Sequence, residues 1–136
     1  MNPTLQLQEI VRDALAVDPV LKVAGVTVVM QDQADFARIL EEGLGLADGP
    51  VAVIAIDRCE NNAPGIVVDW KLYVTERAAV NRERQNYLTA SAAAWRCVEI
   101  LDGSTHHWSG WNSEIYEEGV FQVTLSFKTL LTRTKG

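Results

Sequence analysis

Cysteine is scarce in this chain, and its two cysteines, Cys59 and Cys97, lie far apart without a C-x-x-C motif. The two could pair, but one isolated pair without a secretion signal is more typical of free, buried thiols. Residues 1–6 lack the basic start and apolar run of a signal peptide. No stretch approaches the roughly 18 consecutive apolar residues of a membrane span. We therefore expect a soluble, cytoplasmic-type protein that does not insert into membranes.

Basic residues are outnumbered: 12 Lys and Arg against 18 Asp and Glu give a formal net charge of −6. Reading nucleic acid in a groove requires clustered Lys and Arg to neutralise phosphates, so this class of function is not expected. The net charge does not exclude a surface that DNA passes without being bound. The 136 residues, 48% hydrophobic and 22% charged, predict a single domain spanning 1–136 with its own core.

Three segments carry the signals of helices. Residues 2–17 combine a capping residue with a proline at the first helical position and end at Asp18-Pro19. Their apolar positions recur at helical spacing: Leu7, Ile10, Val11, Ala14 and Leu15. Asp32 is expected to cap a short helix that Gly43 closes. Residues 88–101 are alanine-rich and predict a longer helix, with an apolar face made by Leu88, Ala92, Trp95 and Val98.

Five segments read as strands. Residues 25–30 are a short β-branched run, and residues 51–56 are continuously apolar, as in a central strand covered on both faces. Residues 66–76 alternate between apolar and polar side chains, which is typical of a half-buried antiparallel strand. The segments 108–117 and 120–131 complete the set. The last of these points apolar side chains inward at Phe121, Val123, Leu125 and Phe127.

Turn signals at 61–65 and 117–119 predict two hairpins, which would pair these strands locally. The fold class that follows is α+β: a mostly antiparallel sheet of about four to five strands, with two main helices packed on one face. Because the outward side chains of the last strand are polar, we expect one sheet face to meet water or a neighbouring subunit.

The search for catalytic or metal-binding groups yields no recognisable constellation. His106 and His107 are adjacent, and adjacent side chains of an extended segment point to opposite faces, so the two rings do not hold one metal; we expect a polar loop there. Asp57 ends a central strand, where acidic residues usually face solvent. No enzyme activity, metal or cofactor is predicted. The alternative is an enzymatic or small-molecule-binding domain with a site near Asp57, His106 and His107.

Two groups of residues are candidates for contacts with other proteins. The only basic concentration is Arg77, Arg82 and Arg84, in a polar segment that reads as a loop over 77–86. It is either solvated or docks against acidic surface on another subunit, because arginine forks match carboxylates. Trp108 and Trp111 begin a strand and serve as core or as interface anchors. Stacking on nucleic acid would need neighbouring cations that are missing.

One stretch, Trp70-Lys71-Leu72-Tyr73-Val74-Thr75-Glu76 followed by Val80-Asn81-Arg82, precedes the alanine-rich helix and a closing hairpin that includes residues 119–129. In this order the chain resembles bacteriophage tail terminator proteins, of the minor tail protein U type and the Mu-like prophage type. The resemblance covers most of the chain by architecture. It implies a small α+β domain without an active site.

The resemblance also implies assembly. Members of this family form rings, typically of six subunits, that cap the tail tube and face the head-side connector. The implied partners are copies of the chain, the tail tube protein and the connector, while DNA passes without specific binding. The location would be the virion tail, assembled in the bacterial host cytoplasm. The expected contact residues are Arg77, Asn81, Arg82, Arg84, Trp108 and Trp111. Another neck or tail-completion protein is the nearest alternative.

Overall fold

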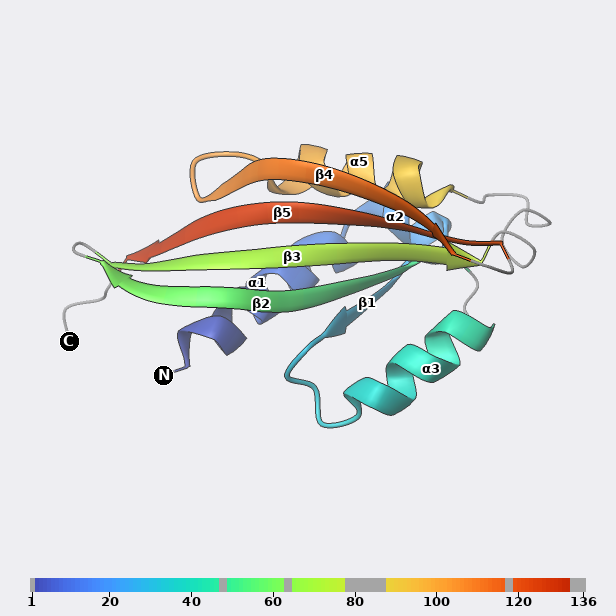
Figure 1. Ribbon diagram of the computed structural model, residues 1–136, viewed down its shortest axis with the longest axis horizontal. Helices are drawn as coiled ribbons and strands as arrows, with labels where there is room; N and C mark the ends of the chain where they lie inside the picture. The colour runs from blue at the N-terminus through green and yellow to red at the C-terminus, as the bar shows by residue number, and fades with distance from the viewer. Residues whose placement is uncertain (1, 47–48, 63–64, 78–87, 117–118, 133–136) are drawn as a thin grey trace.

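A single five-stranded sheet organises the computed structural model, which describes residues 2–46, 49–62, 65–77, 88–116 and 119–132 (Figure 1). The elements follow one another as α1 (Pro3–Ala16), α2 (Pro19–Val23), β1 (Thr27–Met30), α3 (Phe36–Leu46), β2 (Val51–Asn62), β3 (Gly65–Arg77), α5 (Ala90–Leu101), β4 (His106–Tyr116) and β5 (Val120–Thr132). The strand order is β1-β2-β3-β5-β4. Of the four strand pairs in the described ranges, β1–β2 is parallel and the other three are antiparallel, which confirms the predicted mostly antiparallel α+β fold.

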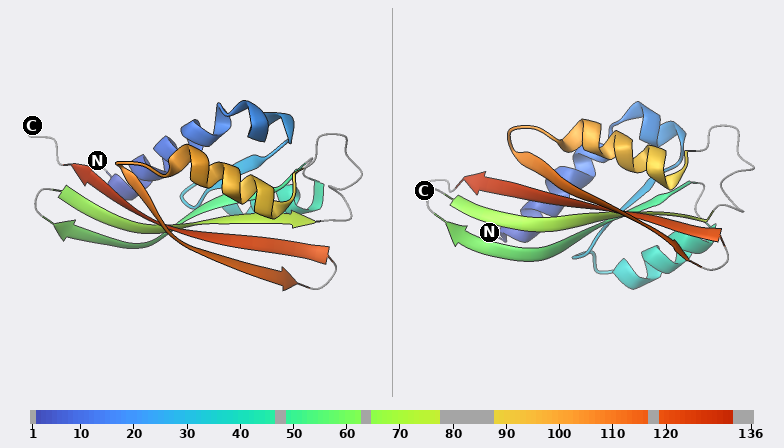
Figure 2. Two further views of the ribbon diagram at one scale, coloured as in Figure 1. Left: turned by 90° about the horizontal axis from the view of Figure 1, so that it is seen from above. Right: turned by 45° about the horizontal axis from the view of Figure 1, so that its top comes forward.

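The two main helices, α1 and α5, pack on one face of the sheet, as the sequence predicts (Figure 2). We call this side the helical face and the other side the open face. The third helix, α3, lies across one end of the open face, where Phe36 and Ile39 pack against Val29, Val51 and Val53. These three valines point away from the main core, so a second apolar cover is needed at this end. Within the described residues, no helix is both long enough and apolar enough to cross a membrane.

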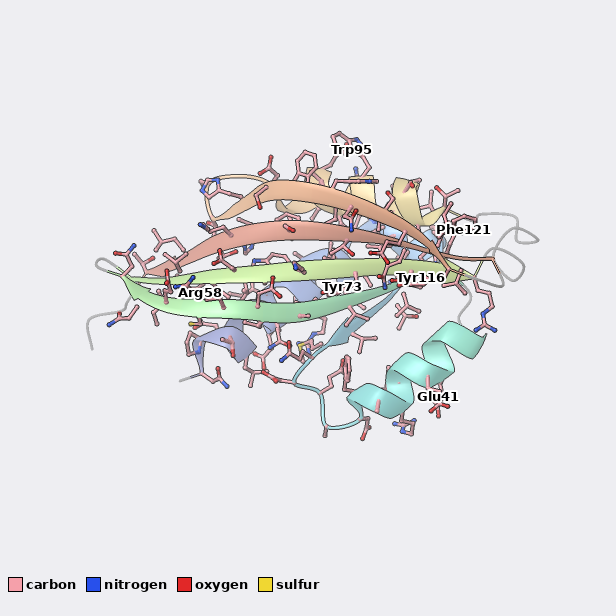
Figure 3. The ribbon with its side chains drawn as sticks, in the orientation of Figure 1. Glu41, Arg58, Tyr73, Trp95, Tyr116 and Phe121 are labelled. Atoms are coloured by element: carbon pink, nitrogen blue, oxygen red, sulfur yellow. The ribbon has the colours of Figure 1, made fainter. Side chains whose placement is uncertain are left out.

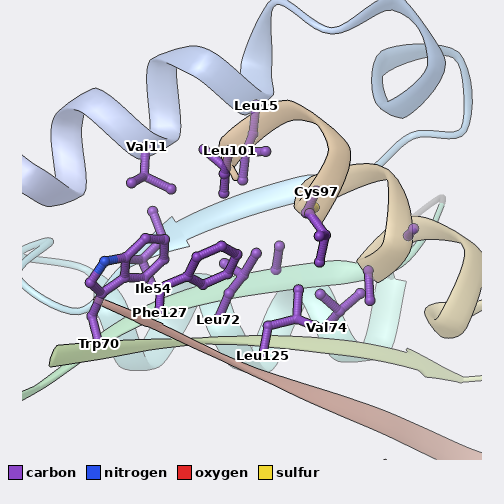
Figure 4. Close-up of a cluster of buried hydrophobic side chains, with 14 of the residues drawn as sticks. Val11, Leu15, Ile54, Trp70, Leu72, Val74, Cys97, Leu101, Leu125 and Phe127 are labelled. Atoms are coloured by element: carbon purple, nitrogen blue, oxygen red, sulfur yellow. The ribbon is translucent and has the colours of Figure 1, made fainter. Parts of the chain in front are cut away.

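The main core lies between the helical face and the two long helices (Figure 4). At its centre Trp70 of β3 stacks on Phe127 of β5, with ring centroids 4.5 Å apart and nearly parallel planes. Leu7, Val11 and Leu15 of α1 are fully buried above the sheet. The alternating apolar side chains of β3 and β5 therefore meet the apolar stripe of α1, as their patterns predict.

The start of the chain differs from the prediction at one junction. Helix α1 is capped as expected, because the Asn2 side chain accepts hydrogen bonds from the amides of Thr4 and Leu5. Asp18, which follows this helix, also begins the next one: its carboxylate accepts a hydrogen bond from the Leu21 amide at 3.1 Å and so caps the short helix α2. The sequence pattern did not predict α2. A helix of five residues is too short to show periodicity.

Helix α3 exists but is displaced along the chain. It begins at Phe36 and runs to Leu46, so Asp32 is not its cap and Gly43 does not close it. Instead Asp32 binds α1: its carboxylate accepts from Gln8 Nε2 at 2.9 Å, and its amide donates to Gln8 Oε1 at 3.1 Å. This pair between the buried Gln8 amide group and the exposed Asp32 is a long-range contact, and local sequence gives no signal of it.

The hairpin strands are longer than predicted. Residues 61, 62 and 65, expected in a turn, pair across β2 and β3, and Arg77 is the last residue of β3 instead of part of a loop. Strand β4 begins at His106, so the two histidines belong to a strand. Strand β1 is shorter, from residue 27 to 30. Both predicted hairpin pairings, β2 with β3 and β4 with β5, are confirmed.

The buried face of α5 is only partly the predicted one: Val98 is buried, and Leu88, which lies just before the helix, packs half-buried against the core. Trp95 is 50% exposed, and Ala92 is exposed as well. The residues that face the sheet are small or medium in size: Ala90, Ala93, Ala94, Cys97, Val98 and Leu101. Small side chains let the helix lie close to β3 and β5, while the indole of Trp95 is displaced to the flank. It contacts the Trp108 ring edge to face, with centroids 5.7 Å apart.

Candidate subunit interface

Strand β4 forms the long free edge of the sheet. It pairs with β5 on one side, and its other side pairs with no strand in the described part of the chain. Its 11 residues contain neither Lys nor Pro, the residues that commonly protect an edge strand from pairing. One irregularity between Trp108 and Gly110 interrupts the register, and the rest is regular. The start of this edge is covered by the preceding turn, because the Gly103 amide donates to the His106 carbonyl at 2.8 Å and the Trp108 amide donates to Asp102 Oδ1 at 3.1 Å. Beyond Trp108 the strand offers its outer backbone groups to another chain.

Exposed apolar side chains accompany this free edge. Trp111 and Ile115 lie on the helical-face side of β4, in cross-strand register with Leu125 and Phe121. Trp111 is 38% exposed and Ile115 is 77% exposed, and Trp95 of α5 stands above the same strand (Figure 3). We call Trp95, Trp108, Trp111 and Ile115 the tryptophan edge. Exposed aromatic clusters of this kind are common at protein–protein contacts.

Two indole N–H groups of the tryptophan edge, those of Trp108 and Trp111 on β4, already have partners. Trp108 Nε1 donates to the Gly110 carbonyl at 2.8 Å, and Trp111 Nε1 donates to Ser113 Oγ at 2.8 Å. A second protein could thus cover these rings without leaving a buried donor unpaired. The arrangement favours apolar docking over ligand chemistry.

The structure brings together only part of the predicted contact set. Trp108 is half-buried and Trp111 is exposed, and both lie on β4. Arg77 is exposed at the end of β3, while Asn81, Arg82 and Arg84 fall outside the described residues. Sequence reasoning missed Trp95 and Ile115. A helical-spacing count on the small residues of α5 could have placed Trp95 outside the core.

Away from α3 the open face carries several polar side chains, and two of its lysines pair with aspartates. Lys71 Nζ lies 3.5 Å from Asp57, and Lys128 Nζ lies 3.7 Å from Asp69. The outward side chains of β5 in this region are Thr124, Ser126 and Lys128, as the alternation predicts. Exposed pairs of this kind contribute little stability. They keep the sheet face solvated without building a strong field of one sign.

The residues of the alternative site do not converge. His106 is buried on the helical face, where Nδ1 lies 2.7 Å from Thr129 Oγ1 and burial lowers the pKa of the ring. His107 pairs with Lys128 in the register and is exposed. Asp57 belongs to β2, which two strands separate from β4, a distance of about 14 Å at ordinary strand spacing. In the described ranges, no three His, Cys, Asp or Glu side chains cluster closely enough to hold a metal.

Both cysteines are free, as predicted, but only one is buried. Cys97 faces the sheet from α5, and burial raises the pKa of its thiol to about 12. Because the thiolate is the reactive form, this cysteine acts as a packing residue. Cys59 is exposed on β2, contrary to the expectation of a buried thiol. The register places Cys59 in the solvated outer half of the β2–β3 hairpin.

The comparisons with known proteins give a fold-level result. No family model matches the chain, and no curated protein matches its sequence. Among solved structures, a chain from the virion of a native gene transfer agent particle is similar, with a TM-score of 0.59, 18% identity, and coverage of 93% of this chain and 95% of that chain. A crystal structure from Akkermansia muciniphila has a TM-score of 0.44 and 8% identity over 98% of this chain and 78% of its own. The first likeness shows a shared fold, whereas the second is too weak to indicate one.

Proposed function

We propose that this chain is a structural protein of a phage-like virion, and that it forms a ring which terminates the tail tube and joins it to the head-side connector. The main support for this proposal is that β4 lies at the free side of the sheet and is accompanied by the exposed side chains of the tryptophan edge. The fold shared with a virion chain, over nearly the full length of both, supports the virion setting. The sequence resemblance to tail terminators supports the position at the end of the tail.

A ring requires two different contact surfaces on each subunit, because head-to-tail contacts close only when unlike surfaces meet. The tryptophan edge is one such surface. A second exposed apolar group lies on the other flank of α5, at the end of α1 and on α2: Val17, Val20 and Val23. One flank of α5 faces β4, because Trp95 contacts Trp108. The other flank faces α2, because Arg96 binds Asp18 at the start of that helix. We propose that these surfaces meet between successive subunits.

The oligomeric state tests the ring. Light scattering coupled to size exclusion should find a discrete oligomer, a hexamer by the family pattern, and negative-stain images should show rings. Ile115→Glu places a charge within the proposed contact and should give monomers. Leu130→Glu is the matched control: Leu130 is a 41% exposed apolar residue on the open face of β5, and its replacement should leave the oligomer intact. A wild-type protein that stays monomeric and does not bind tail tubes would refute the proposal.

Another neck or tail-completion protein remains the second candidate, since the same edge would serve a contact with a different virion protein. Binding assays with purified tail tubes and connectors distinguish the two, because a terminator must bind both. The enzymatic alternative loses its support, since Asp57, His106 and His107 are dispersed over both sheet faces. The net charge of −6 agrees with a channel that DNA crosses without being held.

A further inference from the structure

The N-terminal end of α5 covers a pocket of about 310 Å³ on the helical face of the sheet. Residues 89–91 form its roof. Its floor consists of side chains from two neighbouring rows across β3, β5 and β4: Glu76, Phe121 and Ile115 in one row, Val123 and Ser113 in the other. The lining combines apolar side chains with the polar residues Glu76, Thr89, Ser91, Ser113, Glu114 and Gln122. The volume is near the low end for ligand pockets, about 300–1,000 Å³, and suits a single side chain.

Glu76 is the unusual member of this pocket. It is only 3% exposed, and its Oε2 atom is buried without a hydrogen-bond partner among the described residues. Helix capping does not account for it, because the Thr89 hydroxyl accepts the Ala92 amide at 3.0 Å in that role. The positive end of the α5 dipole favours a negative charge nearby but supplies no donor to Oε2. A buried acceptor left unpaired is costly, so a donor from elsewhere is expected.

We propose that this pocket binds the guanidinium group of an arginine side chain presented by another copy of this chain. The planar guanidinium donates several N–H groups and pairs with carboxylates in a two-point geometry, so it satisfies Glu76 directly. The methylene groups of the same side chain pack against Ile115 and Val123. The Ser91 and Ser113 hydroxyls accept the remaining N–H groups. A buried carboxylate beside apolar side chains is the arrangement that such a side chain requires.

The location of the pocket points to a neighbouring subunit as the source. Ile115 belongs both to the pocket wall and to the tryptophan edge, so a copy docked on β4 passes over the pocket mouth. The sequence supplies candidate donors in Arg82 and Arg84, which lie outside the described residues. The assignment of the arginine donor to a neighbouring copy rests on the proposed ring, whereas the existence of a guanidinium site at Glu76 does not. The two claims therefore fail in different experiments.

Titration with agmatine, a guanidinium on a four-carbon chain, tests the site on the full-length protein. Amide shifts of Ser91 and Ser113 in ¹H–¹⁵N spectra should saturate with wild-type protein. Glu76→Gln should weaken agmatine binding at least about tenfold, because a charge-assisted pair becomes a neutral one. Glu99→Gln, an exposed carboxylate on the same helix, is the matched control and should leave binding unchanged. Equal affinity of wild type and Glu76→Gln would overturn the proposal.

Two further variants cover the remaining outcomes. Ser113→Phe fills the pocket from its floor and leaves Glu76 in place, so it should abolish agmatine binding even if Glu76→Gln fails to fold. The double variant Arg82→Gln, Arg84→Gln identifies the source. Because an arginine of a neighbouring copy competes with agmatine in the wild type, this variant should bind agmatine more tightly than the wild type does and should lose its oligomer. Absence of saturable shifts in both proteins would refute the site, whatever the oligomeric state.

Discussion

The junction between α1 and α2 offers a quantitative test of how this fold is held together. Asp18 is buried, and it has two roles: its carboxylate caps α2 through the Leu21 amide, and it pairs with Arg96 of α5 through bonds of 2.6 and 3.1 Å. The hydrogen bonds from Arg96 are the main cause of the lowered pKa of Asp18. One side chain thus joins the short helix α2 to the main helical layer.

Two substitutions separate these roles. Asn is as good a helix cap as Asp, so Asp18→Asn removes the charge pair and keeps the cap. Because the Arg96 side chain is about one-third exposed and water can resolvate it, we expect a loss of about 2 kcal/mol, less than for a fully buried pair. Asp18→Ala also removes the cap and should cost about 1 kcal/mol more. For a chain of this length 1 kcal/mol corresponds to roughly 3–4 °C in Tm.

The pH dependence follows from the direction of the shift. The folded-state pKa of Asp18 lies below its usual value of 3.8, so the charge pair contributes fully above about pH 4 and is lost as the pH falls through the folded-state value. Urea unfolding of wild type and Asp18→Asn from pH 7 to pH 2 should show the gap in unfolding free energy shrinking at the acid end. A gap that is constant over this range, or Asp18→Asn as stable as wild type, would refute the reasoning.

Three other predictions concern the core and the flank of α5. Thr129→Val removes the oxygen that accepts from Trp70 Nε1 at 2.8 Å and bonds His106, so it should cost about 2–3 kcal/mol in urea unfolding, whereas Thr132→Val at the exposed strand end should cost little. Burial lowers the folded-state pKa of His106 below its usual 6.5, so stability should fall as pH drops below about 6.5, and His106→Asn should flatten that slope in pH-dependent melting. Trp95→Ser should cost less than about 1.5 kcal/mol, because the indole loses only a flank contact; a loss of about 3–5 kcal/mol would mean that it is a core residue.

The interface followed only partly from the sequence. Trp108 and Trp111 stood out as aromatic residues on a strand, and the structure places both on the free edge. Helical spacing with Leu88, Ala92 and Val98 predicts Trp95 in the core, whereas the buried stripe of α5 is built largely from alanines at a neighbouring register. Ile115 looked like an ordinary strand residue. Its exposure depends on the position of β4 at the edge of the sheet, and no local sequence pattern predicts that position.

Several features were determined by the sequence alone. Alternation of apolar and polar side chains in 66–76 and 120–131 dictated which side chains of β3 and β5 face the core, because the side-chain period of a strand is two. Asn2 and Pro3 set the start of α1, and the turn signals set both hairpins. These are local rules, and they act wherever the residues occur.

Only the tertiary structure decided the rest. The order β1-β2-β3-β5-β4 makes β4 an edge, and it joins Glu76, Phe121 and Ile115 in one row beneath α5. The pairing of Asp18 with Arg96 spans 78 positions of sequence. Such contacts depend on which elements become neighbours in the folded chain. The sites proposed for partners lie at these junctions, because the residues that form them belong to strands and helices distant in sequence.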